Sequence, residues 1–393
     1  MAPTDPAPDR HGAAARPEAS TPAAGRPGGR PPRRALAALL AVSLGLTVLV
    51  PLTNQSPYGD LSAGYTDHLH HAHATWVFLH RGLEAYRLPL AESSRGVAFP
   101  QETGAWPQMP VNYPPGMFAV FLPLSVAGRL VPMSQETFGR VGVLWLLVLA
   151  HLALGAVFVL LADLPAGGRA VVGMIAWIYL VRLALQGFFD VTFIGAGAMA
   201  MLALHRRRPG PALLWLAGAA LLHYRAVALV PVGIAALWMA LRRPPAERPW
   251  RALAAVGAAC AVVVGTFLLQ WPVTRAYLDT LHPALGAIGT GPRFWAVVVA
   301  SAAAGVASLW LAGGLAAGLV VAALGLALTD IYDWWHGAVL LFAPMAVGVH
   351  GARAASSGRA VLVGWLLLMQ PLGFDQTPSH LFLDFARHYR ARG

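Results

Sequence analysis

Residues 141–162 read VGVLWLLVLAHLALGAVFVLLA, which is 22 residues without an acidic residue, an arginine or a proline. About 20 apolar residues suffice for a helix to cross the hydrocarbon core of a bilayer, so this run can cross once. Similar runs recur and predict an all-α fold, a polytopic transmembrane helical bundle of about 11–12 apolar segments. The runs cover residues 35–52, 116–131, 141–162, 170–186, 188–204, 211–222, 226–241, 251–272, 294–312, 314–329, 334–350 and 360–373.

The amino-acid composition also indicates a membrane protein. Of the 393 residues, 57% are hydrophobic and 11% are charged, whereas about 25% of residues are charged in soluble domains. All 28 basic residues are arginines, and the net charge is +11. These arginines do not form the clustered basic face that nucleic acid binding needs, so we expect no nucleic acid partner. Cys260 is the single cysteine, which excludes an intrachain disulfide and a cysteine zinc site.

The first residues form a separate region. Residues 1–34 are rich in proline, alanine, glycine and arginine, which predicts a disordered cytoplasmic tail. Residues 35–373 then form the transmembrane domain, and residues 374–393 form a polar C-terminal tail. A charged segment followed by an apolar run is also the pattern of a secretory signal peptide. Because no small-residue cleavage site follows and further apolar runs do, we expect the first run to remain as a membrane helix.

Arginines concentrate in short loops between the apolar runs, and such loops lie on the cytoplasmic side of membranes. They occur at residues 33–34, 206–208, 242–251 and 353–359. The other connections, with the C-terminal tail, are expected on the outer side: residues 53–115, 223–225, 273–293 and 330–336. An odd number of crossings must separate the outer loop 53–115 from the arginines at 206–208, yet four apolar runs lie between them. We therefore expect one of them, 116–131 or 188–204, to be a half-span.

The outer loop 53–115 is more polar than the apolar runs on either side of it. It holds five of the 17 acidic residues, namely Asp60, Asp67, Glu84, Glu92 and Glu102. Within it, residues 67–84 predict an amphipathic helix that lies in the membrane interface, because apolar residues recur at spacings of three and four. These apolar residues are Leu69, Ala72, Trp76, Leu79 and Leu83. The opposite face is expected to face water and carries Asp67, His70, His71, Ala74 and Arg81.

The histidines of this helix have two interpretations. They are either solvated surface residues or metal ligands, since the i, i+3 spacing of His70 and His73 and the i, i+4 spacing of Asp67 and His71 can place two ligands together. No second ligand pair at a recognised spacing accompanies them. We therefore expect no physiological metal at His70, His71 and His73.

The loop ends in Tyr113-Pro114-Pro115, where the two prolines favour a rigid return to the bilayer or simply the start of the next helix. Together with Gly64-Tyr65-Thr66-Asp67, the interfacial helix and the segments 82–86 and 185–190, this motif resembles the GT-C membrane glycosyltransferases. Within them, it is similar to the polyprenyl-phosphate-mannose-dependent mannosyltransferases of actinobacteria. The resemblance covers about residues 35–240. In this chain His223-Tyr224-Arg225 replaces the Lys-Pro of relatives, and residues 186–190 replace their Gly-Gln-x-Asn turn.

The resemblance implies inverting transfer of a hexose, mannose being expected, from a polyprenyl phosphate to a lipid- or glycan-linked acceptor on the outer face. Such a reaction needs a carboxylate to take the acceptor proton and cations to stabilise the departing phosphate. Asp67 is the candidate general base, with Asp60 in reserve; a plain helix N-cap is the alternative for Asp67. The alternatives to an enzyme are a transporter or lipid flippase, and a catalytically silent scaffold of this fold.

The remaining candidates are contacts to the substrates. Ionisable groups within or beside membrane spans are costly and therefore point to function. The candidates for the donor phosphate are Arg225, His223, Arg182 and Arg293; Arg182 could instead extend to the membrane interface. The candidates for other substrate contacts are His70, His71, Tyr113, Asp190, Tyr224, Asp333, Trp334 and His336. Asp333, Trp334 and His336 could equally belong to an aromatic belt at the membrane surface.

Overall fold

The computed structural model describes residues 33–52, 67–97, 111, 113–161 and 187–281, together with parts of 173–185. Most of the predicted N-terminal tail, the apolar runs after residue 281 and the C-terminal tail lie outside the described residues. Within the described part every regular element is helical. The elements are α1 (Arg33–Leu52), α2 (Asp67–Arg81), η2 (Gly82–Tyr86), α3 (Leu90–Ser93), α4 (Gly116–Leu130), α5 (Gln135–Leu160), α7 (Val191–His205), α8 (Pro209–Leu222), η4 (Tyr224–Leu229), α9 (Val230–Leu241), η5 (Pro245–Glu247) and α10 (Trp250–Leu281).

Several helix ends follow directly from the sequence. Ser134 caps α5, since its side chain accepts a hydrogen bond from the Thr137 backbone N–H at 3.2 Å. α8 begins with Pro209, whose fixed φ suits the first helical turn. It ends at His223, whose backbone is extended (φ −155°, ψ 137°).

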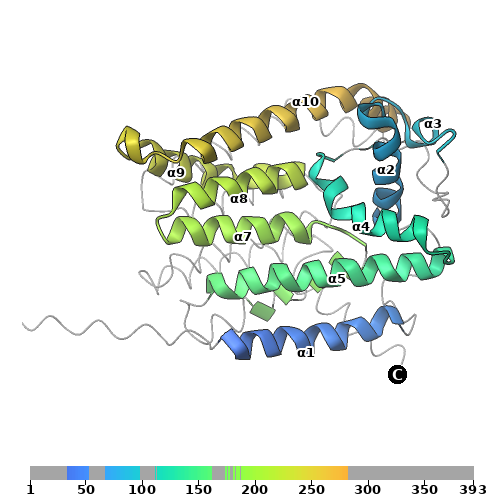
Figure 1. Cartoon of the computed structure of the whole chain (residues 1–393), viewed down its shortest axis with the longest axis horizontal. Helices are drawn as coiled ribbons and strands as arrows, with labels where there is room; N and C mark the ends of the chain where they lie inside the picture. Colours follow the sequence, from blue (N-terminus) through green and yellow to red (C-terminus); the bar gives the residue numbers. More distant parts are fainter. Residues whose placement is uncertain are drawn as a thin grey trace, which may run out of the picture.

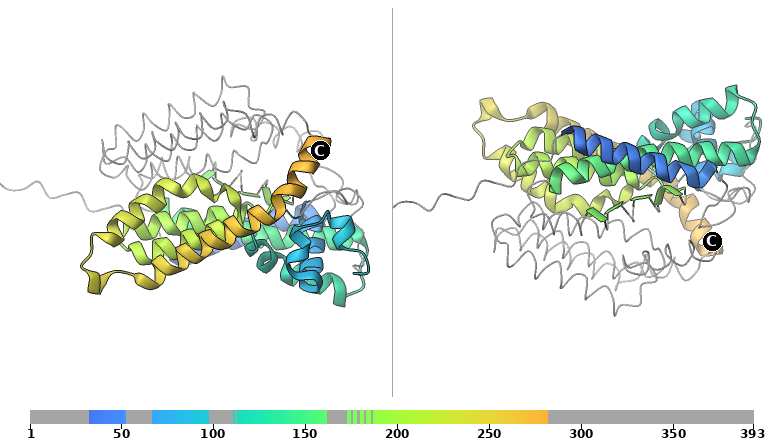
Figure 2. Two further views of the ribbon diagram at one scale, coloured as in Figure 1. Left: turned by 90° about the horizontal axis from the view of Figure 1, so that it is seen from above. Right: turned by 90° about the horizontal axis from the view of Figure 1, so that it is seen from below.

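The long helices α1, α5, α7, α8 and α10 run alongside one another, and α2 lies across their direction at one end (Figure 1). α7 packs between α5 and α8, while α1 packs on α5 and α10 on α8. α2 packs chiefly on α4. The views along the other directions show the same layering (Figure 2). An element near the start of the chain therefore covers one end of the bundle.

The two ends of the bundle differ in charge. The start of α1, the turn between α7 and α8, and the connection between α9 and α10 lie together at the end far from α2 (Figure 1). They carry the arginines at 34, 206–208 and 242–251. This is the segregation that the orientation prediction requires, with arginine loops at one end and α2 at the other.

The two candidates for the half-span form helices of equal length, since α4 and α7 each have 15 residues. α4, which ends after 15 residues, stays at the α2 end beside the first half of α5 (Figure 1). The Nε1–H of Trp145 in α5 donates to the Val120 carbonyl of α4 at 3.0 Å. α7 packs between α5 and α8 and lies toward the arginine end (Figure 1). Which of the two runs, 116–131 or 188–204, is a half-span stays a prediction.

Two of the described helices are long and apolar enough to cross a membrane. They are Glu136–Leu160, with 25 residues, and Trp250–Ala276, with 27 residues. The other apolar helices of the described part have 10–17 residues.

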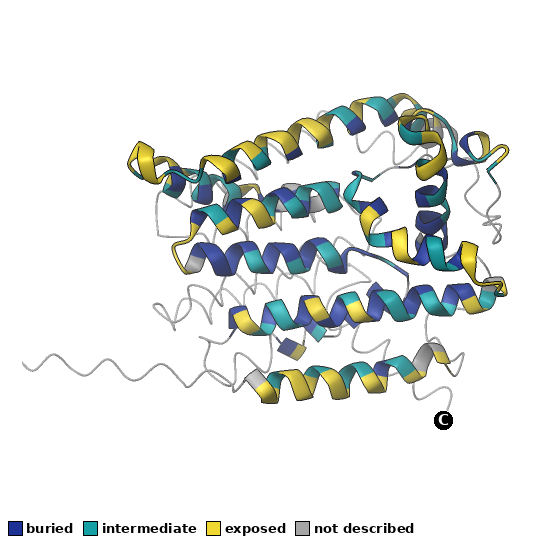
Figure 3. Cartoon of the chain, in the orientation of Figure 1, coloured by how far each residue is buried: buried dark blue, intermediate teal, exposed yellow. Residues whose placement is uncertain are grey.

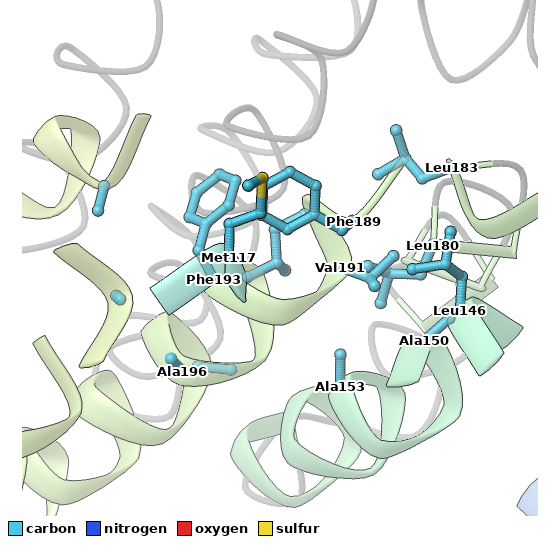
Figure 4. Packing of buried hydrophobic residues seen from close by; sticks show 14 of the residues in the cluster. Met117, Leu146, Ala150, Ala153, Leu180, Leu183, Phe189, Val191, Phe193 and Ala196 are labelled. Carbon is cyan, nitrogen blue, oxygen red and sulfur yellow. The ribbon is translucent and has the colours of Figure 1, made fainter. Parts of the chain in front are cut away.

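The core lies between α5 and α7, where small residues allow close approach. A Cβ added at Gly195 would lie 3.1 Å from the Cβ of Ala153. Figure 4 shows Ala150 and Ala153 of α5 facing Val191 of α7, with Phe189 and Phe193 beside Met117 at the edge of this layer. Small residues at helix contacts are typical of helix packing inside membranes.

Gly116→Ala is expected to lower the free energy of unfolding by about 1–3 kcal/mol, because overpacking at a rigid contact is costly. The added methyl group would meet the backbone carbonyl oxygen of Leu221 where α4 begins against the end of α8. Gly218→Ala is the matched control, since nothing lies within 4 Å of its added Cβ. Denaturant titration in detergent measures both variants, and equal losses would contradict this close approach.

Candidate functional site

The helix α2 is held against α4 and α5 by polar contacts. The Nε2 atom of His68 lies 2.9 Å from the Gly139 carbonyl oxygen of α5. The Ser125 hydroxyl of α4 donates to the Ala72 carbonyl at 2.7 Å. A side chain at Gly142 would meet the His68 ring, so this glycine lets the ring lie against α5. The N-terminal half of α2 is therefore fixed from two sides.

The sequence predicted the position of this helix well but its exposure incorrectly. α2 and η2 together span 67–86, close to the predicted 67–84. However, the face that we expected in water is covered, since His70 is 3% exposed, His71 2% and Ala74 0%. Leu79 and Leu83, which we expected to face the bilayer interior, are 52% and 54% exposed. Packing against α4 and α5 covers both faces of the first turns, and only the C-terminal end of α2 stays open.

An aromatic cluster forms around the covered His71. Its ring centroid lies 4.8 Å from that of Tyr113, 4.9 Å from Phe189 and 5.1 Å from Phe121. The ring of His223 contacts two of these rings as well, because its centroid lies 5.0 Å from that of Tyr113 and 5.5 Å from that of Phe189. We call His71, Tyr113, Phe189, Asp190 and His223 the buried cluster.

Asp190 completes this cluster through His223. Its Oδ1 atom lies 3.4 Å from the His223 Nε2, and the two side chains are 2% and 4% exposed. Although Asp190 precedes α7, its side chain caps no backbone N–H of that helix. The contact thus links the start of α7 to the end of α8.

A glycine turn delivers Phe189 and Asp190 to this place. Gly187 has φ +87°, the left-handed conformation that glycine adopts without strain. The Gly187 N–H donates to the Ala184 carbonyl at 3.1 Å, and the Phe188 N–H donates to the Leu183 carbonyl at 2.9 Å. This pair of bonds is the Schellman termination of a helix. The segment 185–190, picked out by the resemblance, is therefore a helix stop followed by two cluster residues.

Four of the predicted site residues are thus brought together: His71, Tyr113, Asp190 and His223. Tyr224 is not part of the buried cluster. Its hydroxyl instead accepts a hydrogen bond from Gln270 of α10 at 2.7 Å. Asp67 is the first residue of α2, and Arg225 lies in η4, two residues after His223; their side chains are not among those described. The predicted residues that lie outside the described part are Asp60, Arg182, Arg293, Asp333, Trp334 and His336.

The sequence reasoning missed the aromatic partners in the cluster. Phe121 and Phe193 each lie about 5 Å from a histidine ring, at 5.1 Å and 5.0 Å between centroids. Both belong to apolar runs in which a phenylalanine carries no signal of its own. Only the packing of α4 on α2 and of α7 on α8 identifies them.

Burial keeps the His68, His70 and His73 rings of α2 neutral by lowering the pKa of each. Loss of hydration lowers the pKa of His68 and of His73 to about 4. The pKa of His70 is lowered to about 3, first by burial and then by the neighbouring His73. Among the described residues, no three histidine, cysteine or acidic side chains lie close enough together to hold a metal ion.

These neutral histidines predict a loss of stability in acid. Below about pH 6.5 the unfolded chain binds protons on these rings, while the folded chain does so only when the pH reaches lower values. The free energy of unfolding should therefore fall with pH in this window, by about 1.4 kcal/mol per pH unit for each histidine. Unfolding midpoints in detergent across this range measure the slope. His70→Phe should reduce the slope, and a profile without slope would contradict the burial of these rings.

No protein-family model, curated protein or solved structure matches this chain. Function is therefore inferred from the sequence and from the geometry of the site.

Proposed function

We propose that this chain is an integral membrane glycosyltransferase that transfers a hexose, mannose in the first instance, from a polyprenyl phosphate to a lipid- or glycan-linked acceptor. The transfer takes place at the α2 end of the bundle, on the outer face of the cytoplasmic membrane. One observation carries this proposal: His71 of α2, Tyr113, Asp190 and His223, the residue directly before η4, come together at the end opposite the arginine loops.

Membrane insertion is supported by the outer surfaces of α1 and α10. Figure 3 shows exposed residues along much of both helices. Many of these are large and apolar, with exposed fractions of 40–65%: Leu39, Val42, Leu46, Leu49, Phe267 and Leu268. Apolar surface of this extent would be unfavourable in water and suits contact with lipid. α2 then lies in the plane of the outer interface, because it runs across the long helices.

Asp67 is the general base in this mechanism. It begins α2, and the positive end of a helix dipole favours an ionised carboxylate. The Asp67 carboxylate accepts the proton of the acceptor hydroxyl as that oxygen forms a bond to the anomeric carbon. The bond from this carbon to the phosphate oxygen breaks on the opposite side, so the configuration inverts and the polyprenyl phosphate leaves.

Arg225 balances the charge of the departing phosphate. A guanidinium group can donate two parallel hydrogen bonds to phosphate oxygens, which suits a group that gains negative charge. η4, which carries Arg225, follows directly after His223, and His223 is fixed by Asp190 and the rings of Tyr113 and Phe189.

The buried cluster has a positioning role in this proposal. His71, Asp190 and His223 are each no more than 3% exposed, so they do not form an open substrate surface. They join α2, the turn before α7 and the end of α8 into one unit. We assign them the task of holding the base on α2 and the cation on η4 at a constant separation.

Membranes that contain the overexpressed chain test the proposal when they are supplied with radiolabelled polyprenyl-phosphate mannose. We expect label in an extractable glycolipid or glycan, at a level well above that of membranes from cells with an empty vector. The absence of any such increase would contradict the proposal. A chelator arm addresses the histidines, because loss of transfer that Zn²⁺ or Mn²⁺ restores would show that the reaction depends on a metal.

A further inference from the structure

A cavity of about 600 Å³ lies along the bundle, on the side of α5 where α1 packs, and extends to α7 and α8. Its walls come from four helices, and they include Leu36 of α1, Leu152 and Val159 of α5, Met199 of α7 and Trp215 of α8. Its floor is made of small residues, Ala153, Gly155 and Ala156 of α5 with Gly195 and Ala196 of α7. We call this cavity the α1–α7 groove.

One charged side chain lines the groove, among the residues described. It belongs to Arg206, which follows the last residue of α7 at the arginine end of the bundle. Among the described residues, Arg206 forms no ion pair. The groove is therefore apolar along its length and cationic at one end.

Other arginines near Arg206 make this end of the groove more positive. Arg34, Arg207 and Arg208 are exposed at the same end. Glu247 is the acidic residue that the described part places there. A ligand with a negative head and an apolar tail would be oriented by this charge, with its head at Arg206.

The length of the groove matches a lipid chain. It follows α7 from Val191 to Arg206, which at 1.5 Å per residue is about 22 Å. One leaflet contributes about 15 Å of hydrocarbon to a bilayer. An acyl chain that starts at Arg206 can therefore stay within the groove across its whole leaflet.

We propose that the α1–α7 groove is a binding site for one anionic phospholipid of the leaflet at the arginine end. Arg206 binds the phosphate, and an acyl chain lies on the small residues of α5 and α7. The lipid fills the space beside the first half of α1, whose second half is held by a hydrogen-bonded pair, Ser43 Oγ and His151 Nε2, at 2.9 Å. This inference depends on membrane insertion and not on sugar transfer.

Lipid retention measures the site directly. The purified full chain is reconstituted into vesicles of phosphatidylglycerol or of phosphatidylcholine with the same acyl chains. It is then extracted with a mild detergent, and native mass spectrometry gives the number of lipid molecules that stay bound. We expect one phosphatidylglycerol molecule to remain bound at a lipid concentration about tenfold lower than the concentration at which one phosphatidylcholine molecule remains bound. Equal retention of the two lipids would overturn the proposal.

Two arginine variants separate a defined site from general attraction. Arg206→Gln should remove the preference for phosphatidylglycerol, whereas Arg208→Gln, which changes the same charge outside the groove, should keep it. An equal loss in both variants would show diffuse attraction to the arginine loop and would overturn the site. Ala156→Phe, which fills the floor, should abolish retention of the lipid without removing any charge. Retention by Ala156→Phe at the level of the unchanged chain would also overturn the proposal, provided that its unfolding midpoint shows it to be folded.

Discussion

Replacing Asp67 with asparagine is expected to reduce sugar transfer by about 100-fold or more, because a positioned general base contributes a factor of this size. Asparagine has nearly the shape of aspartate and caps helices about as well. The variant should therefore fold like the unchanged chain, with the same unfolding midpoint. Only the ability to take up the acceptor proton is lost.

This choice of variant separates catalysis from capping. If Asp67 only capped α2, Asp67→Asn would retain both stability and transfer, while Asp67→Ala would lose about 1 kcal/mol of stability. Asp60→Asn is the matched control and should transfer sugar at the normal rate. Loss of transfer in Asp60→Asn with normal transfer in Asp67→Asn would move the role of base to Asp60.

Asp190→Ala is expected to lower the free energy of unfolding by about 3 kcal/mol or more, since removing one partner of a buried polar pair leaves the other uncompensated. The His223 ring would lose its acidic neighbour at 3.4 Å while it stays enclosed by aromatic rings. Asp190→Asn should cost less, because an amide still offers an oxygen to the ring. Titration with denaturant in detergent measures both losses.

A partly exposed pair provides the control for this prediction. Glu136 and Arg140 form an ion pair on α5 with side chains 41% and 29% exposed. Glu136→Ala should cost less than about 1 kcal/mol, the range found for pairs near the surface. A loss in Asp190→Ala no larger than that in Glu136→Ala would show that the buried cluster does not hold the helices together.

The features that could be predicted from sequence were those with a local or compositional cause. The length of apolar runs predicted the long helices, and arginine placement predicted that the start of α1 and residues 206–208 share one end. The 3–4 spacing of apolar residues located α2 within a few residues. Each of these signals depends on neighbours along the chain.

Features that depend on distant packing could not be predicted. The periodicity of α2 identifies two faces, but it cannot show that α4 and α5 cover the face with His70 and His71. Likewise, 116–131 and 188–204 are similarly apolar and each forms a helix of 15 residues, and only the packing shows that α4 lies against α2 whereas α7 lies between α5 and α8. The contact of Asp190 with His223 joins residues on different helices, so neither residue type alone signals it.

The most direct test of the account follows the fate of a doubly labelled donor in sealed vesicles that contain the purified chain and an extract of membrane lipids as acceptor. The sugar and the polyprenyl chain carry different isotopes. We predict that the sugar label leaves the polyprenyl label and appears on a second lipid, and that Asp67→Asn vesicles leave the two labels together. Movement of the intact donor from one leaflet to the other, with both labels still joined, would contradict an enzyme and identify a flippase.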